Sequence, residues 1–230
     1  MSTERRSAAK HSARDQSAYG LAEAARYLKL PPATLRAWTF GRQYPTTTGA
    51  GQFHPLIRPA SRRPPLLSFT NLIEAHVLRA LRTEHGVSVQ AVRNAVRFAE
   101  GKLHIDRLLL RPELCAEAGR MFLDRYGELI NLSASGQLAM RQVLNTHLKR
   151  VTWEGHFPSR LHPFVMGQAD MPIAIDPRIA FGRPIVASRG VSTAAIVGRI
   201  DAGESVSDVA ADYELSREDI EHAVLYERAA

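Results

Sequence analysis

Apolar residues recur at helical spacing early in the chain. A regular spacing of three and four positions is shared by Leu21, Ala24, Ala25 and Leu28. This spacing predicts one apolar face on a first helix over residues 21–29. The segment "LPPA" at 30–33 interrupts the pattern, and its second proline suits the first turn of a second helix that runs to about Phe40. We therefore expect two short helices joined by a tight turn.

The second helix has one apolar and one polar side. Burying Leu35 and Trp38 against the first helix turns three polar residues outward, namely Thr34, Arg36 and Thr39. In helix-turn-helix proteins the second helix enters the major groove of DNA, and outward polar side chains read the base edges there. The pattern favours a nucleic-acid-binding unit.

The middle of the chain predicts a small α+β segment. Two short apolar runs in 121–133 flank a turn with glycine and indicate a hairpin, and apolar spacing over 137–149 indicates a helix. Strands are expected at "VTW" and "LHPFV". We interpret this segment as a packing or dimerisation module.

The C-terminal part predicts a strand at "IAI" followed by three short helices. The first helix carries Ile196 and Ile200 and ends at Gly203. Ser205 is expected to cap the second, and Ser216 with Asp219 forms a capping box for the third. Three short helices joined by tight turns predict a helix-turn-helix-like bundle of homeodomain type.

Charge is distributed unevenly along the chain. The net charge is +7, and residues 1–65 hold eleven basic and three acidic residues. Residues 171–230 hold six basic and ten acidic residues. We therefore expect the N-terminal part to contact phosphates and the acidic C-terminal part to face another protein.

Several function classes receive no support from the sequence. Cys115 is the single cysteine, and no apolar run approaches the ~18–20 residues of a membrane span, so we expect a cytoplasmic protein with no membrane association. The spacing of His147, His156 and His162 fits no metal motif, and no nucleophile elbow or phosphate loop accompanies them. We expect no catalytic residues, no metal and no cofactor, and structural or surface roles for the histidines.

The segment "YGLAEAARYLKLPPATLRAW" resembles the opening helix-turn-helix of the MerR-type winged helix family. "LSFTNLIEAHVLRALR" and "VSVQAVRNAVRF" resemble its third and fourth helices. The resemblance implies that Thr34 and Arg36 contact DNA and that the wing lies between Gly41 and Pro65. That segment carries four cations among prolines and glycines, which suits an exposed loop that contacts phosphates, the alternative being a basic loop that is only solvated. These cations are Arg42, Arg58, Arg62 and Arg63.

Residues 172–228 resemble the small antitoxin domain called domain of unknown function 433, which occurs in bacterial toxin-antitoxin operons. The residues that carry the resemblance include "IDP" from 175, "GRP" from 182, "AGES" from 202, "DY" from 212 and "LSREDI" from 215. The resemblance implies pairing with a PIN-like ribonuclease toxin, in which Arg183 or Arg189 could pair with metal-binding carboxylates. Simple solvation of both arginines is an equally weighted alternative.

The preferred interpretation is a non-enzymatic, VapB-like antitoxin that binds its toxin and, as a homodimer, represses its own operon on operator DNA. A stand-alone MerR-like regulator whose middle segment senses a ligand is the main alternative, and an enzyme acting on nucleic acid is a third. We expect a mainly α (α+β) fold. Its parts are a flexible basic arm (1–17), a winged helix-turn-helix domain (18–100), an α+β linker or dimerisation segment (101–170) and an antitoxin-type helical domain (171–230).

Overall fold

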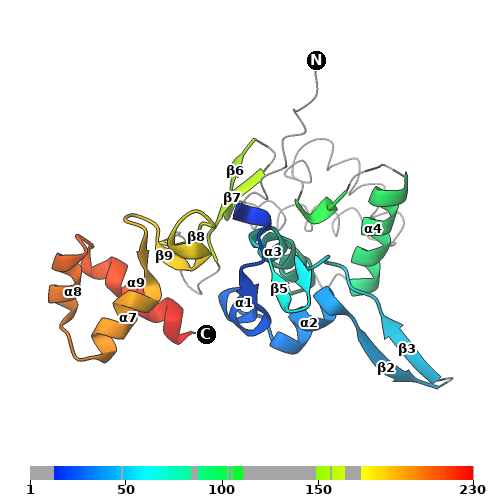
Figure 1. Cartoon of the computed structure of the whole chain (residues 1–230), viewed down its shortest axis with the longest axis horizontal. Coiled ribbons are helices and arrows are strands. Elements are labelled where there is room, and N and C mark those ends of the chain that lie inside the picture. Colours follow the sequence, from blue (N-terminus) through cyan, green and yellow to red (C-terminus); the bar gives the residue numbers. More distant parts are fainter. Residues whose placement is uncertain are drawn as a thin grey trace, which may run out of the picture.

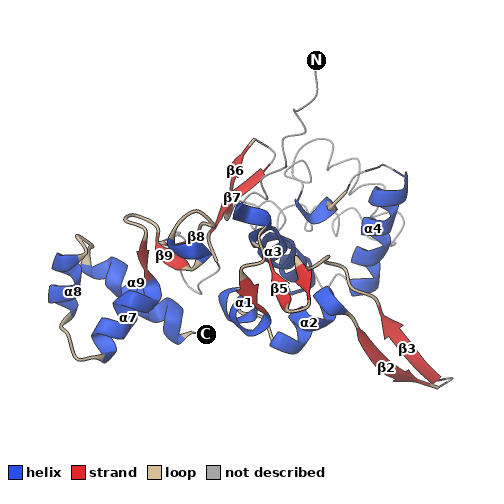
Figure 2. Cartoon of the chain, in the orientation of Figure 1, coloured by secondary structure: helices blue, strands red, loops and turns tan. Residues whose placement is uncertain are grey.

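The computed structural model describes residues 13–47, 49–83, 88–102, 104, 106–110, 149–155, 157–163 and 172–229. Over these residues the chain is a mixed α and β protein with seven α-helices and three antiparallel sheets (Figures 1 and 2). The mixed character agrees with the expected α+β class. In Figure 1 the three C-terminal helices stand apart from the remaining helices, and strands connect the two groups.

The N-terminal domain contains the two expected helices, followed by strands and two longer helices. The first helix ends two residues earlier than predicted because Leu28 caps it and Lys29 has a positive φ of 51°. Its elements are β1 (Tyr19–Gly20), α1 (Leu21–Tyr27), α2 (Pro32–Phe40), β2 (Arg42–Thr46), β3 (Gly49–Phe53), β4 (Ser61–Arg62), β5 (Pro65–Leu67), α3 (Phe69–Thr83) and α4 (Val89–Lys102).

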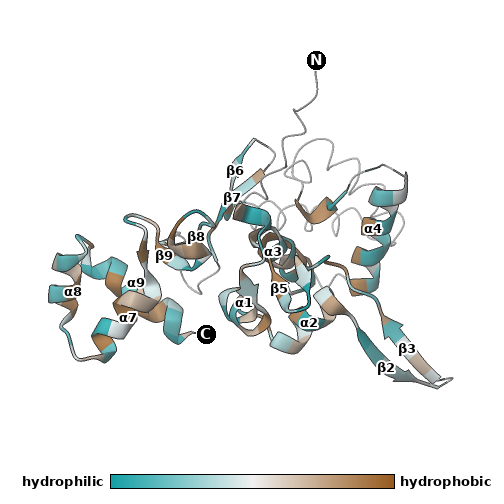
Figure 3. Cartoon of the chain, viewed as in Figure 1, coloured by the Kyte–Doolittle hydropathy of each residue, from teal (hydrophilic) through white to brown (hydrophobic). Residues whose placement is uncertain are grey.

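Helix α3 forms the centre of the first hydrophobic core. Almost all of its described side chains are buried, including the polar residues Asn71, Glu74 and His76. Side chains from α1, α2, β5 and α4 pack around it, together with the leucines of the 3-10 helix η2 (Leu108–Leu110). In Figure 3 strand β2 is hydrophilic, whereas Leu108–Leu110 is hydrophobic. Burial of this apolar surface is the main source of the domain's stability.

A five-stranded antiparallel sheet joins the N-terminal domain to the C-terminal unit. Its order is β10-β9-β8-β7-β6. Leu161 and Ile175 pair across β7 and β8 and both belong to the first core, whereas Ile173 and Val186 belong to a second core. The sheet therefore spans both cores. Its strands are β6 (Val151–Glu154), β7 (Phe157–Leu161), β8 (Ile173–Ile175), β9 (Pro184–Val186) and β10 (Val191–Ser192).

The C-terminal unit contains the three expected helices. These are α7 (Thr193–Asp201), α8 (Val206–Asp212) and α9 (Arg217–Arg228). The Ser205 side chain accepts from the Asp208 N–H, and Ser216 and Asp219 form a complete capping box, as predicted. The helices pack together with β8 and β9 around the second core. The unit is thus a helix and strand assembly, and the expected homeodomain-like bundle remains a prediction.

Two expectations about segment boundaries change. The 3-10 helix η1 (Ala13–Asp15) packs against α3, and Thr70 donates to Asp15 at 3.0 Å, so the end of the supposed arm belongs to the fold. The second middle strand lies at β7 and reaches only the first residue of "LHPFV", because His162 and Pro163 continue without regular structure. The predicted hairpin in 121–133, the first 12 residues of the predicted helix at 137–149, and two of the histidines (His147 and His156) lie outside the described residues.

Candidate nucleic-acid interface

The turn between α1 and α2 is fixed by the backbone. The Leu30 N–H donates to Ala25 O at 2.9 Å, and Pro32 occupies the first turn of α2. Leu35 and Trp38 are buried as predicted, while Arg36 is exposed and Thr34 is half-buried. Helix α2 therefore presents the Arg36 guanidinium to solvent, in the manner required for contact with a nucleic acid.

The prediction that Thr39 faces outward is wrong. Its side chain is fully buried, and its hydroxyl donates to Leu35 O at 2.8 Å. A threonine in a helix can donate a hydrogen bond from its hydroxyl to a carbonyl oxygen of the preceding turn, which lowers the free-energy cost of burying the hydroxyl. Thr39 consequently supports the packing of α2 and does not belong to the exposed surface.

A β-hairpin extends directly from the C-terminal end of α2. Gly41 ends the helix with φ 80°, and a Cβ there would lie 2.6 Å from Phe53 O, so only glycine fits this close approach. The returning chain is bound to the same end of the helix, because the N–H groups of Leu56 and Ile57 both donate to Trp38 O. The hairpin β2–β3 is thus fixed to α2 at its base and projects away from the domain (Figure 1).

Three of the four basic residues predicted for the wing lie in two separate hairpins, and the fourth lies between them. Arg42 begins β2, whereas Arg62 and Arg63 lie in β4 and in the turn that connects it to β5. Arg58 precedes this second hairpin. All four residues are exposed. The segment expected to hold the wing, between residues 41 and 65, therefore contains two hairpins, of which β2–β3 is the longer.

Two further arginines on α4 lie beside the β2–β3 hairpin. The Arg93 guanidinium donates to His54 O at 2.8 Å and lies 4.5 Å from the centroid of the Phe53 ring. Burial lowers the pKa of Arg93, and the nearby positive charge of Arg97 lowers it further. Arg97 itself is exposed. This pair was not expected from the sequence, although residues four positions apart lie on the same side of a helix and the spacing is recognisable.

Along the sequence, the charge from the end of α1 to the start of α3 is of one sign. The chain has no acidic residue between Glu23 and Glu74, whereas this interval contains seven Lys and Arg residues. Such a concentration of cations attracts phosphates. We define the exposed side chains of this region as the basic surface, which comprises Arg36, Arg42, Arg58, Arg62, Arg63 and Arg97.

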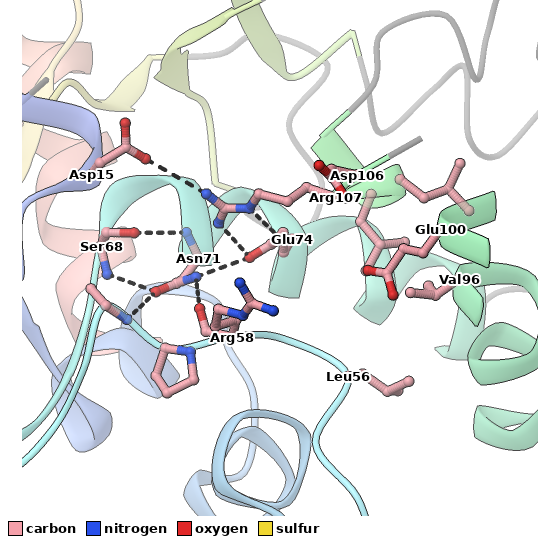
Figure 4. Close-up of a pocket in the computed structure, with 14 residues that line it drawn as sticks. Asp15, Leu56, Arg58, Ser68, Asn71, Glu74, Val96, Glu100, Asp106 and Arg107 are labelled. Carbon is pink, nitrogen blue, oxygen red and sulfur yellow. Dashed lines mark hydrogen bonds and ion pairs between the residues drawn. The ribbon is translucent and has the colours of Figure 1, made fainter. Parts of the chain in front are cut away.

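A pocket of about 390 Å³ lies on the other side of the Arg58 segment, between α3, α4 and η2 (Figure 4). Asn71 lies in the wall of the pocket, where its side-chain amide donates to Arg58 O at 2.8 Å and to Glu74 at 2.9 Å. Arg107 donates to both oxygens of Glu74, at 3.0 and 2.9 Å, and lies 3.6 Å from Asp15. Asn71, Glu74 and Arg107 thus form a network, and Asn71 fixes the backbone that carries Arg58.

In the C-terminal unit, the two candidate toxin-binding arginines are exposed and engaged in ion pairs. Arg183 lies 2.5 Å from Glu23 of α1, and Arg189 lies 3.3 Å from Glu214. Both side chains are more than half exposed. Ion pairs of this kind contribute little free energy, so a partner's carboxylates can replace them. Their role in toxin binding remains a prediction.

The described residues contain no group of three or more His, Cys, Asp or Glu side chains that could hold a metal ion. His162, the one member of the histidine set within the described ranges, places Nδ1 3.1 Å from Ile173 O. None of the described helices is both long and apolar enough to cross a bilayer.

Comparison with protein families identifies two domains. Residues 173–226 match a family described as "Protein of unknown function (DUF433)", and residues 17–96 match one described as "Putative DNA-binding HTH domain". The second description does not mention MerR, so the MerR-type assignment remains a prediction.

Alignments with similar proteins cover nearly the whole chain. "Putative antitoxin VapB45" of Mycobacterium tuberculosis (strain ATCC 25618 / H37Rv) is 28% identical over 225 residues, which cover 90% of this chain and 92% of the relative. "Uncharacterized protein Rv2308" of the same strain is 26% identical over 224 residues, covering 92% and 90%. The crystal structure of Rv2018 from Mycobacterium tuberculosis matches with a TM-score of 0.68 and 25% identity, over 91% of this chain and 98% of that chain.

Proposed function

We propose that this chain is a DNA-binding antitoxin, which neutralises a PIN-like ribonuclease toxin and represses its own operon. The observation that carries the proposal is the combination of two units in one chain. A helix-turn-helix domain with a basic surface precedes a unit that matches the DUF433 family, and a relative named as a putative antitoxin aligns over 90% of this chain and 92% of its own. We propose that the protein acts by binding alone and catalyses no reaction.

The basic surface supports the DNA half of the proposal. Arg36 is exposed on α2, the helix that would enter a major groove, and Arg42 is exposed at the start of the adjoining β2–β3 hairpin. Arg58, Arg62, Arg63 and Arg97 provide cations for phosphates on either side. One such helix gives limited specificity, so we propose that two copies of the chain bind two half-sites as a homodimer.

The acidic C-terminal unit supports the toxin half of the proposal. Its exposed arginines, Arg183 and Arg189, contrast with its net negative charge. A PIN-like ribonuclease holds metal ions with carboxylates, and a guanidinium forms strong paired hydrogen bonds with carboxylates. We therefore propose that these arginines contact the acidic site of the toxin and cover it.

A growth assay tests the proposal directly. The neighbouring open reading frame is induced in cells with and without the full chain. Growth arrest that is relieved by co-expression supports the antitoxin function, and a neighbour without effect on growth contradicts it. In parallel, titration of the upstream DNA with purified chain at fixed salt tests operator binding, with a scrambled duplex of equal length as the control.

A stand-alone regulator that senses a small molecule is the second candidate. The pocket beside Arg58 favours it, because an occupant there would touch the loop that carries part of the basic surface. If the neighbouring open reading frame is harmless, the operator complex should be challenged with small polar metabolites. Release of DNA by one of them would support this alternative.

A further inference from the structure

One loop of the C-terminal unit exposes a large aromatic side chain. Phe181 is 91% exposed, which is the highest value among the exposed large hydrophobic residues of the described part of the chain. A phenylalanine in this position gains nothing from folding, because apolar surface stabilises a fold only when it is removed from water. Its position is accounted for if the ring is buried by another molecule.

The backbone that carries Phe181 is strained. Ala180, Phe181 and Gly182 have consecutive positive φ angles of 48°, 55° and 75°. The left-handed region is unfavourable for residues other than glycine, and such strain is concentrated at ligand clamps and functional sites. The N–H groups of Gly182 and Arg183 donate to Ile179 O and Ala180 O, so the loop is nevertheless ordered by its own hydrogen bonds.

Residues of the N-terminal domain contact this loop and hold it in place. A Cβ on Gly182 would lie 2.1 Å from the Tyr19 hydroxyl oxygen, so the glycine is in close contact with β1. The next residue, Arg183, forms its ion pair with Glu23 of α1. A loop that is held in place before binding loses little conformational entropy when a partner arrives.

Exposed arginines, each paired with at least one carboxylate, lie near Phe181 in sequence or on the segment that contacts its loop. The interval from 177 to 200 contains no acidic residue, although the C-terminal unit as a whole is acidic. Arg178 and Arg183 flank Phe181 in sequence, and Gly190, next to Arg189, lies against Ile179 of the loop. All three arginine side chains are more than half exposed. A central aromatic residue within a polar, arginine-containing rim is the usual composition of a protein-binding hot spot.

We propose that Phe181 is the anchor of the partner-binding surface and that it inserts into an apolar pocket edged by carboxylates on the toxin. This inference rests on the proposed antitoxin function and adds the site through which it operates. Arg183 and Arg189 leave their weak intramolecular pairs and bind the carboxylates around that pocket.

The test measures the affinity of the full chain for the purified product of the neighbouring gene by isothermal titration calorimetry. Phe181→Ala should weaken the complex by about 30-fold or more, the loss that defines a hot spot. Phe157→Ala is the matched control, since Phe157 on β7 is also exposed, at 61%. Its affinity should stay within about threefold of the wild-type value, as is usual for a contact outside the hot spot.

A second variant separates binding from folding. Phe181→Gly removes the ring and relieves the left-handed strain, so its melting temperature should equal or exceed that of the wild type while binding is lost. Wild-type affinity in both Phe181 variants would overturn the inference and leave the antitoxin function intact. Absence of binding by the wild-type chain would overturn the proposed function itself.

A second copy of this chain is the competing occupant. Sedimentation velocity on the Phe181→Ala variant distinguishes the two cases. If the substitution dissociates a homodimer and leaves the affinity for the neighbouring gene product unchanged, the anchor serves self-association and the proposal is wrong.

Discussion

Glu23 of α1 and Arg183 of the C-terminal unit form an ion pair across the two units, with 2.5 Å between Oε1 and Nη1. Glu23 also accepts from the Tyr27 hydroxyl at 2.8 Å, and this hydrogen bond, after burial, helps to raise the pKa of Tyr27 to about 12. The carboxylate therefore stabilises the first helix of the DNA-binding domain and holds one of the two candidate toxin-binding arginines. A toxin that binds Arg183 would have to displace Glu23.

The first prediction concerns the strength of this pair. A double-mutant cycle with Glu23→Gln and Arg183→Met should give a coupling free energy of about 0.5–1 kcal/mol, because both side chains are partly exposed. The coupling should fall as salt is added. The control cycle is Arg217→Met with Glu221→Gln, an exposed pair within α9, for which about 0.3–0.5 kcal/mol is expected. Denaturant unfolding of each variant provides the measurement, and a stability loss in the double variant equal to the sum of the two single losses would show that the residues do not interact in solution.

The second prediction concerns the recognition helix. Arg36→Ala should weaken operator binding by about 1–3 kcal/mol and leave the fold unchanged, because the side chain is exposed and no described contact depends on it. Titrations at several matched salt concentrations provide the measurement. Arg217→Ala on the acidic helix α9 removes an equally exposed cation and should not alter binding. Identical titrations of Arg36→Ala and the wild type would exclude α2 as the contact.

The third prediction concerns the base of the β2–β3 hairpin. Gly41→Ala should destabilise the protein by about 1–3 kcal/mol, because the new Cβ would lie 2.6 Å from Phe53 O at a positive φ. Gly198→Ala is the control, since this glycine lies in α7 with no atom within 4 Å of the added carbon. The control should gain about 0.5–1 kcal/mol from helix propensity. Urea unfolding measures both, and an unchanged midpoint for Gly41→Ala would mean that the hairpin moves freely.

The fourth prediction concerns acid stability. Burial by itself raises the pKa of Asp176. Hydrogen bonds from Arg178 and the charge of Arg160 lower it by a larger amount, so the pKa lies below its ordinary value. A depressed pKa in the folded state gives stability that is present above the pKa of the unfolded chain, about 3.9, and is lost as the pH falls through the folded value.

Thermal unfolding between pH 6 and pH 2 tests whether stability is lost as the pH falls. The melting temperature should fall below about pH 4 in the wild type, and Asp176→Asn should be less stable at pH 6 and show a shallower decline. Asp201→Asn is the control, because Asp201 is exposed and its pair with Arg228 spans 3.4 Å. A decline as steep in Asp176→Asn as in the wild type would assign the acid sensitivity to other carboxylates.

The elements with strong local signals were predictable from the sequence. The spacing of Leu35 and Trp38 identified the buried side of α2, and Ser205 and Ser216 identified two helix starts, because caps and helical periodicity depend on residues within one or two turns. The prediction for Thr39 was wrong because periodicity alone does not reveal that its hydroxyl donates to Leu35 O.

The contacts between the two units were not predictable by this reasoning. Glu23 and Arg183 are separated by 160 positions, and no local pattern connects them. Phe181 was also missed, because a hydrophobicity pattern assigns an apolar residue to a core, whereas the left-handed backbone turns this one into solvent. The Arg93 and Arg97 pair depended on the position of α4 beside the hairpin, which is a tertiary relationship.

The docking of α9 on α1 closes a very long loop. Arg26 pairs with Glu227 at a separation of 201 positions, and Lys29 donates to Tyr226 O across 197 positions. The two units also share buried surface, because Gly182 lies against Tyr19, the Tyr226 hydroxyl donates to Tyr27 O, and Ile175 of β8 belongs to the first core. A substitution that loosens one unit should therefore lower the stability of the other. A shift of the C-terminal unit on meeting a partner would likewise be transmitted to α1.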